Sequence, residues 1–253
     1  MTRWTNVVAA VWLAVLGVLG AGAAQAADLI ILPNQGAVPG VREIAAAFAR
    51  ASGHKVTVVT EAGAALEQRL NNGPGDLVST NPGPMADLVK SGKVVANTVT
   101  PFVWAGLGLA VKAGAPKPDI STPEAYKAAL LAAKSIGYSR GCSGTNIGKG
   151  IEELGLTEQL KAKTIFTGNG PVTDYLARGD FEIGIQQTNI MVGVPGVDFV
   201  GTLPGFLNKR CQSDVAVMTV SKNPEAAREM IKFMISPEAA PLLRKTQAEP
   251  FKS

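Results

Sequence analysis

The stretch Leu29–Thr60, LIILPNQGAVPGVREIAAAFARASGHKVTVVT, decides the fold. Its short apolar run at 29–32 predicts a strand, and residues 38–51 predict a helix that places Val41, Ile44 and Phe48 on one face. Glycine then turns the chain into a β-branched segment at 55–60, which predicts a second strand. A strand, a helix and a strand in this order are typical of an α/β sheet protein.

The same alternation continues from this stretch toward the C-terminus. A Pro/Gly-rich connector at 113–119 separates two series of elements, and Ser121-Thr-Pro-Glu124 after it is a good helix start, with proline just inside the first turn. The predicted helices are 64–71, 84–91, 144–154, 172–177, 224–235 and 237–246. The predicted strands are 76–79, 102–111, 135–139, 163–166, 182–186 and 215–220. We therefore predict two α/β units.

The N-terminus has the three parts of a signal peptide. Arg3 provides the positive charge, residues 7–19 are apolar, and Ala24-Gln25-Ala26 offers small residues for cleavage near Ala26. A membrane anchor is the alternative interpretation, but the apolar run is short for a bilayer span of about 20 residues. We therefore expect a signal peptide at 1–26, a periplasmic protein and no stable membrane insertion.

Composition and net charge limit the classes of molecule that this chain is expected to bind. The chain has 24 Lys and Arg against 20 Asp and Glu, for a net charge of +4, without a basic run, so nucleic acid is not an expected partner whereas a small anion is. Cys142 and Cys211 are able to pair in an oxidising compartment, and two free thiols are the open alternative. The single histidine, His54, has no neighbours at metal-ligand spacing and is expected in an exposed turn. We expect no metal and no cofactor.

Four strings carry a resemblance to a known family. They are EIAAAF at 43–48 with SGHKV at 52–56, DLVS at 76–79 with DLVKSG at 87–92, GDFEIGIQ at 179–186, and residues 227–237 ending in FMISP. Together they span most of the chain beyond the signal peptide. In this order and spacing they resemble the type II periplasmic solute-binding proteins, in particular the molybdate-binding-like branch of ABC transporter receptors.

The resemblance implies two lobes, each a mixed sheet flanked by helices, with the ligand in the cleft between them. Lobe one would combine residues 27–106 with 214–253, and lobe two would be 107–213. The chain would cross outward within 102–111 and return within 215–220. A receptor of this kind would act as a monomer and deliver its ligand to an ABC permease.

The loops that follow the predicted strands are the candidate ligand site. They lead into helix N-termini, where free backbone N–H groups and the helix dipole favour anions. The loop at Ser139–Thr145 is the most informative, because its serines, threonine and backbone amides are able to converge on one oxyanion, and Arg140 adds a fork suited to a carboxylate. The predicted ligand-binding residues are Asn34, Gln35, Gly63, Ala64, Thr80, Asn81, Arg140, Ser143, Gly144, Thr145, Gln186 and Gln187.

Departures from the family bear on the identity of the anion. The molybdate-binding members have serine-rich loops after the first two strands, whereas this chain has Asn34-Gln35 and Glu61-Ala62-Gly63. Amide side chains are able to donate to one oxygen while they orient another. A small organic acid is therefore favoured over a tetrahedral oxyanion.

Two classes of function fit this scaffold. A transport receptor needs no catalytic group, and the sequence has no nucleophile-elbow motif and no Walker loop. The alternative is a cofactor-independent isomerase, since the same branch includes aconitate isomerases, which move a proton within an unsaturated tricarboxylate. In that case Arg140 would stabilise developing negative charge, and Glu61, Tyr138 or an unpaired Cys142 would relay the proton.

Overall fold

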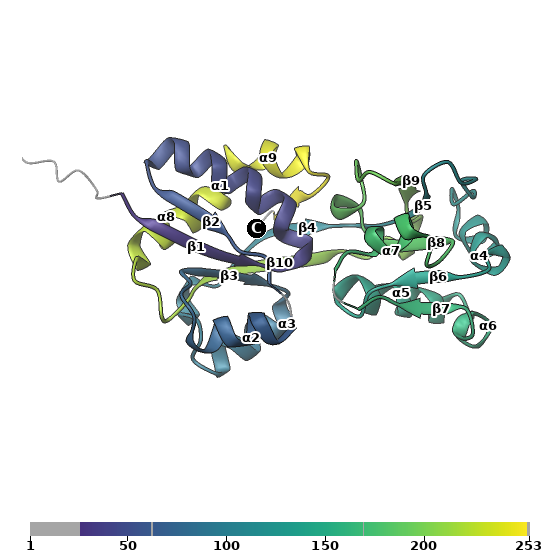
Figure 1. Cartoon of the computed structure of the whole chain (residues 1–253), viewed down its shortest axis with the longest axis horizontal. Helices are drawn as coiled ribbons and strands as arrows, with labels where there is room; N and C mark the ends of the chain where they lie inside the picture. Colours follow the sequence, from purple (N-terminus) through teal and green to yellow (C-terminus); the bar gives the residue numbers. More distant parts are fainter. Residues whose placement is uncertain (1–25, 62, 169, 252–253) are drawn as a thin grey trace, which may run out of the picture.

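The computed structural model describes residues 26–61, 63–168 and 170–251. The predicted signal peptide therefore lies outside the described residues, except for Ala26 at its end. In the part of the chain that is described, no helix combines the length and the apolar character needed to cross a membrane. The chain folds into two α/β lobes joined by two extended crossings (Figure 1).

The first lobe is built on a six-stranded mixed sheet in the order β11-β4-β10-β3-β1-β2. Strand β1 pairs in parallel with β2 and β3, whereas β10 runs antiparallel to β3 and β4. Strands β1, β2 and β3 are parallel, and their carboxyl ends all point toward the second lobe (Figure 1). The strands are β1 (Asp28–Pro33), β2 (Lys55–Val58), β3 (Leu77–Thr80), β4 (Thr100–Ala105), β10 (Cys211–Val217) and β11 (Glu249–Pro250).

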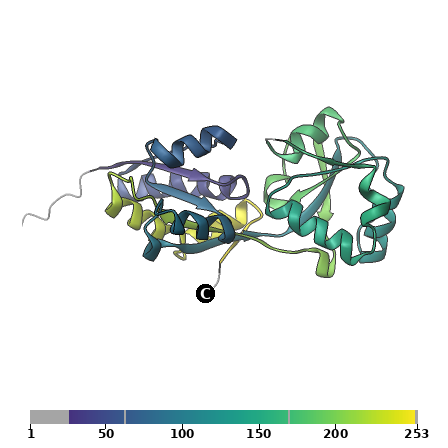
Figure 2. The same ribbon diagram turned by 90° about the horizontal axis from the view of Figure 1, so that it is seen from below.

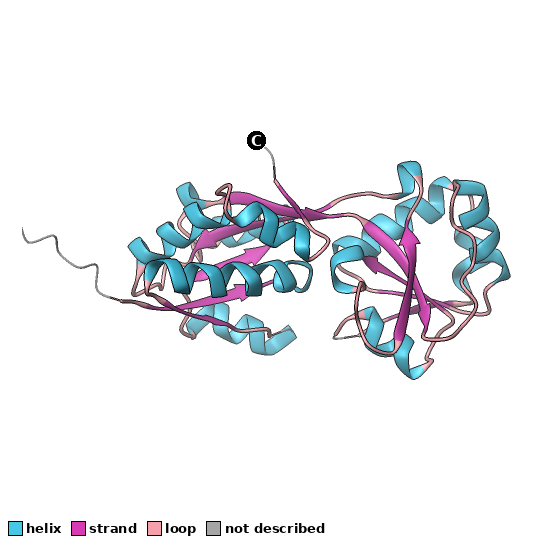
Figure 3. Ribbon diagram, turned by 90° about the horizontal axis from the view of Figure 1, so that it is seen from above, coloured by secondary structure: helices cyan, strands magenta, loops and turns pink. Residues whose placement is uncertain are grey.

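Helices cover both faces of this sheet (Figure 3). Apolar residues at helical spacing on α1, with Ile44 completely buried, pack with α8 and α9 on one face. On the other face Met85 of α3 packs on Leu32 and Val78. These helices are α1 (Val38–Ser52), α2 (Gly63–Asn72), α3 (Pro82–Lys90), α8 (Pro224–Met234) and α9 (Ala239–Lys245).

The second lobe has a five-stranded sheet in the order β7-β6-β8-β5-β9. Strand β6 is parallel to β7 and β8, and β5 is antiparallel to β8 and β9. The strands are β5 (Leu107–Lys112), β6 (Ile136–Tyr138), β7 (Thr164–Phe166), β8 (Ile183–Gln187) and β9 (Val197–Thr202). The helices are α4 (Pro123–Ala132), α5 (Cys142–Glu153), α6 (Thr157–Lys161) and α7 (Val172–Arg178). Single 3-10 turns are η1 (Gln35–Ala37), η2 (Ala96–Thr98), η3 (Thr188–Ile190) and η4 (Gly205–Leu207).

The chain passes between the sheets twice, at adjacent places. Strand β4 ends at Ala105 in the first sheet and β5 begins at Leu107 in the second, so the apolar run predicted at 102–111 is two strands separated by Gly106. The Leu107 N–H donates to Asn208 Oδ1 over 2.7 Å, which ties the two crossings together. We propose that lobe one comprises residues 27–106 and about 211–253, and that lobe two lies between them.

Two sequence-based expectations are wrong. The return strand runs from Cys211 to Val217 rather than over 215–220, because its polar start pairs with β4 on one side and with β3 on the other. His54 is 5% exposed instead of standing in solvent. Its Nδ1 accepts the Ala27 N–H over 3.0 Å, and its ring packs on Phe48 at 5.6 Å between centroids.

The packing of α1 yields a stability prediction. We expect Ile44→Ala to lower the free energy of unfolding by about 2–5 kcal/mol, because it opens a cavity in the core of the first lobe. Arg50→Ala, at the exposed end of the same helix, should change it by less than about 0.5 kcal/mol. Urea denaturation measures both values, and a loss at Ile44 no larger than that at Arg50 would contradict this packing.

Candidate functional site

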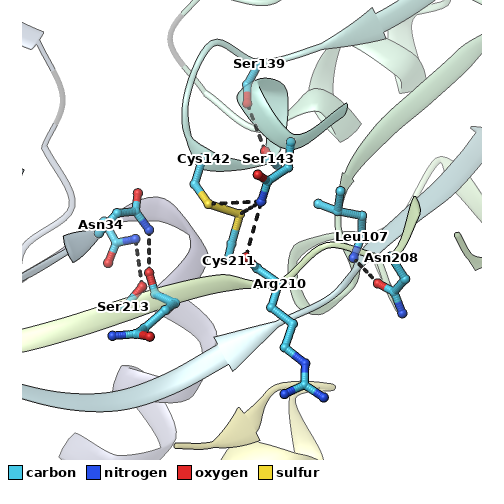
Figure 4. Close-up of a disulfide and its surroundings, with 12 residues drawn as sticks. Asn34, Leu107, Ser139, Cys142, Ser143, Asn208, Arg210, Cys211 and Ser213 are labelled. Atoms are coloured by element: carbon cyan, nitrogen blue, oxygen red, sulfur yellow. Dashed lines mark hydrogen bonds between the residues drawn. A yellow bond between two sulfur atoms is a disulfide. The ribbon is translucent and has the colours of Figure 1, made fainter. Parts of the chain in front are cut away.

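Asn34 holds together the carboxyl ends of β1 and β3 and the beginning of β10. Its Nδ2 donates to Ser213 Oγ over 3.0 Å (Figure 4). Its Oδ1 accepts from Ser79 Oγ over 2.9 Å. Asn81 uses its own Nδ2 to donate to the Gln212 carbonyl over 2.6 Å. Both carboxamides therefore shape the floor of the interlobe region by bonding within lobe one, beside Thr80 at the end of β3.

Loops of the two lobes touch directly at the next residues. Gln186 Nε2 donates to Gln35 Oε1 over 3.0 Å, and Asn189 Nδ2 donates to the Gly36 carbonyl over 2.6 Å. The end of the Gln187 side chain also packs closely on Gly36, in the space that a Cβ atom would occupy. The structure thus brings together Gln35, Gln186 and Gln187, which the sequence placed in separate loops.

The lobe-two loop at Ser139–Thr145 forms a compact turn before α5. Ser139 Oγ and Ser143 Oγ lie 3.1 Å apart, and Gly144 packs so closely under the turn that a Cβ atom would collide with the Ser139 carbonyl oxygen. The helix begins at Cys142, two residues earlier than predicted. Its first-turn N–H groups, on residues 142–144, have no acceptor within the helix and are therefore free for an anion.

A disulfide bond connects this loop to the first lobe. Cys142 and Cys211 are bonded, with 5.9 Å between their Cα atoms, and Ser213, the partner of Asn34, lies two residues further along β10 (Figure 4). Asn146 braces the bridge, since its Nδ2 lies 3.7 Å and 3.6 Å from the two sulfur atoms and donates to the Arg210 carbonyl over 3.2 Å. The loops predicted around Asn34 and Ser139 therefore meet at one place.

Arg140 is exposed at the edge of this region. Its guanidinium lies 4.1 Å from the centroid of the Phe166 ring, at the end of β7. Within residues 26–61, 63–168 and 170–251, no carboxylate forms an ion pair with it. Stacking on Phe166 thus orients a guanidinium whose N–H groups remain available.

The surroundings of the three residues suggested for proton transfer make each of them poorly suited to that role. Hydrogen bonds from Arg69, at 2.6 Å and 2.7 Å, lower the pKa of Glu61 below its ordinary value, so this carboxylate is a weak base. Burial raises the pKa of Tyr138, whose ring packs in the core of the second lobe. Cys142 has no thiol to relay a proton while it is bonded to Cys211, so its suggested role as a relay is wrong for the oxidised protein.

Glu61, Gly63 and Ala64, predicted in the loop after β2, lie at or beside α2 of the first lobe. Glu61 and Arg69 line a surface cavity of about 280 Å³ along α2, together with Gln68 and Pro74. Gly63 begins α2 and Ala64 follows it in the first turn. In the described part of the chain, the hydrogen bonds and the ion pair of Glu61 and Arg69 stay within lobe one.

An open cavity between the lobes contains residues that the sequence did not suggest. It has a volume of about 480 Å³, and both lobes contribute to its walls. Its polar lining residues are Gln35, Arg42, Thr60, Thr173, Asp174 and Asn189. Thr173 is 1% exposed and Asn189 6%, and among the described residues neither Thr173 Oγ1 nor Asn189 Oδ1 has a hydrogen-bond partner. Buried polar atoms normally have partners, so these two unpaired oxygens beside the cavity are unusual.

The sequence carried only weak signals for these residues. Thr173 follows Pro171 at the start of a predicted helix, which is a common place for a polar residue. Arg42 sits on the polar side of α1, where an exposed arginine is ordinary. Within the described residues, no group of three or more His, Cys, Asp and Glu side chains is placed to hold a metal ion.

Comparisons with known proteins agree with this architecture. The model of a family described as bacterial extracellular solute-binding proteins matches residues 34–246. An aconitate isomerase from Pseudomonas sp. is 31% identical over 229 residues, which cover 88% of this chain and 87% of the relative.

Two solved structures have the same fold. The periplasmic molybdate-binding protein of Azotobacter vinelandii superposes with a TM-score of 0.72 at 15% identity, covering 89% of this chain and 99% of that one. A sulfate-binding protein from Mycobacterium tuberculosis H37Rv gives a TM-score of 0.67 at 20% identity and covers 90% and 88%, respectively. At these identities the likeness concerns the two-lobed fold.

The turn before α5 can be tested by two glycines of that helix. Gly144→Ala should lower the free energy of unfolding by about 1–3 kcal/mol, because the new methyl group displaces the Ser139 carbonyl. Gly148→Ala has open space around the new methyl group and should instead raise it by up to about 1 kcal/mol through helix propensity. Urea denaturation measures both changes, and equal effects of the two substitutions would argue against the tight turn.

Proposed function

We propose that this chain, which belongs to the bacterial extracellular solute-binding proteins, binds a small organic acid between its two lobes as the receptor of an ABC transporter. The observation that carries the proposal is the interlobe cavity. Arg42 of lobe one lines it on one side, and Thr173 and Asn189 of lobe two line it on the other. A ligand with several oxygen atoms would be able to accept hydrogen bonds from Arg42 in one lobe and from Thr173 in the other.

The donors around the cleft favour an anion. Arg42 and Arg140 form no ion pair with a carboxylate of the described chain, and the first turn of α5 adds free amides. A guanidinium binds a carboxylate through two parallel hydrogen bonds, which is stronger than a contact between neutral groups. The proposed ligand contacts are the predicted residues on both sides of the cleft, together with Arg42, Thr173 and Asn189.

The size of the cleft favours an organic acid over a compact oxyanion. The cavity of about 480 Å³ is within the range of small-molecule sites. Its donors are spread over α1, α7 and η3 rather than gathered around one point. A molecule with two or three separated carboxylates would use this spread better than a single tetrahedral group.

Export is part of the proposal. The N-terminal segment has the features of a signal peptide cleaved near Ala26, and the family is extracellular, so we place the processed protein in the periplasm. There it would act as a monomer and present its closed form to a membrane permease.

Calorimetric titration of the purified processed protein tests the ligand class. We expect citrate or trans-aconitate to bind, with molybdate and sulfate at least about tenfold weaker, since a compact oxyanion reaches fewer of the separated donors. Tight binding of molybdate would overturn the organic-acid assignment. Absence of binding for all four anions would overturn the proposed function.

Isomerisation of trans-aconitate is the second candidate, favoured by the 31% identity to an aconitate isomerase. Such a reaction needs a base beside the bound acid and a donor that stabilises the negative charge as it forms. Asp174 is the carboxylate that lines the interlobe cavity, and Arg42 lines it from the opposite lobe. They are better placed for these two roles than Glu61, Tyr138 or Cys142.

The same sample separates the two candidates. The trans-aconitate titration mixture is followed for the cis isomer by chromatography. The receptor assignment predicts binding without turnover. Turnover that is abolished by Asp174→Asn and retained by Glu61→Gln would establish the isomerase in its place.

Substitution of the two arginines tests how the carboxylates are held. Arg42→Ala and Arg140→Ala should each weaken binding of the organic acid, by on the order of 2–5 kcal/mol if the ion pair is desolvated in the closed cleft. Arg50→Ala on the same helix as Arg42 is the matched control and should leave the dissociation constant unchanged. An arginine whose loss has no effect in calorimetry lies outside the site.

A further inference from the structure

The disulfide joins the two lobes at the ligand-binding loop itself. Cys142 is the first residue of α5, directly before the free amides of Ser143 and Gly144. Cys211 is the first residue of β10, which lies in the sheet of lobe one, and it is 1% exposed. A covalent bond therefore runs from the anion-binding turn of lobe two to the sheet of lobe one.

This bond lies beside the place where the lobes can turn. Cys211 pairs with Ala105, the last residue of the outward strand, and Asn208 binds the Leu107 N–H at the start of the next strand (Figure 4). In Figure 2 the two crossings run along one side of the molecule, whereas the lobes stand apart on the opposite side. Hinge closure changes the backbone at a few residues of the crossings, so these crossings define its axis.

Distance from that axis decides how far each donor moves on closure. Atoms next to an axis move little when the lobes rotate, and the N-terminus of α5 is bonded next to it. The Asn146 amide contacts both sulfur atoms and the Arg210 carbonyl, which further restrains the turn. The Ser139 and Ser143 hydroxyls and the first amides of α5 should therefore move little relative to β10 when the lobes rotate.

We propose that the Cys142–Cys211 disulfide is a positioning element that assembles half of the anion site before the lobes close, so that its redox state sets ligand affinity. This inference rests on the proposed function, because it concerns the turn at residues 139–145 that is proposed to contact the anion. Preorganised donors do not have to be ordered when the ligand arrives, which raises affinity. Without the bond, the turn of residues 139–144 would become ordered only when the ligand binds. The conformational entropy lost in this step would weaken binding.

The switch is chemically simple. Cys142 is partly exposed, so a dithiol reductant is able to attack its sulfur atom. The sulfur–sulfur bond breaks, two thiols form on Cys142 and Cys211, and the reductant becomes a disulfide. Reoxidation reverses each of these changes.

Two measurements test the inference on the processed protein. Hydrogen exchange followed by mass spectrometry compares the oxidised protein, the dithiothreitol-reduced protein and the Cys142→Ala/Cys211→Ala variant. Titration of each of these three proteins with trans-aconitate and with sulfate compares their dissociation constants. We expect loss of the bond to speed exchange of amides 142–145 and to weaken binding by about tenfold or more.

A matched control separates positioning from general destabilisation. Thr122 caps α4, another helix of lobe two, by accepting the Ala125 N–H over 3.1 Å. Thr122→Ala should loosen that helix while the affinity stays within about twofold of the unsubstituted protein, because α4 does not reach the cleft. If Thr122→Ala weakens binding as much as loss of the disulfide does, the inference fails.

The remaining outcomes are also decisive. Equal affinity and equal exchange in the oxidised and reduced proteins would overturn the inference and leave the proposed function intact. If the oxidised protein binds neither probe, the proposed function fails. In that case only hydrogen exchange of amides 142–145 tests whether the disulfide holds the turn. Equal exchange rates in the oxidised and reduced proteins would overturn the inference.

Discussion

The bond between Cys142 and Cys211 is the constraint on which the geometry of the cleft depends. It holds the start of α5 against β10, while Asn34 ties β10 to the ends of β1 and β3 through Ser213 and Ser79. Besides the disulfide and the crossings, hydrogen bonds from Gln186, Thr188 and Asn189 of lobe two to lobe one join the lobes. The polar loops of both lobes therefore face one another because covalent and hydrogen bonds hold them there.

The chemistry of the cleft follows from unpaired donors rather than from a reactive group. Arg140 is oriented by stacking on Phe166, and the first turn of α5 has amides without acceptors. In contrast, Glu61 is tied to Arg69 and Tyr138 is buried in a core. A site of this kind is better suited to hold an anion than to move a proton, and this balance places the receptor before the isomerase. Asp174, which lines the interlobe cavity, is the residue that would act as the base if the protein were an isomerase.

Periodicity and turn signals in the sequence were enough to predict the α/β class and most of the elements. The βαβ unit at 29–60 appears as β1, α1 and β2, since its apolar spacing and Gly53 act locally. The order of the quoted strings gave the two-lobed family correctly. The polar start of β10 and the burial of His54 were missed, because strand pairing and the Ala27 contact involve residues distant in sequence.

The sequence by itself determined which loops follow strands, and so which amides and hydroxyls are able to face an anion. Only the tertiary structure decided which of them meet. Gln35 with Gln186, Asn34 with Ser213, and Cys142 with Cys211 are separated by 151, 179 and 69 positions, and local spacing says nothing about such pairs. The proposed roles of Arg42, Thr173 and Asn189 depend on a cavity between two lobes, and a cavity exists only after both lobes have folded and packed.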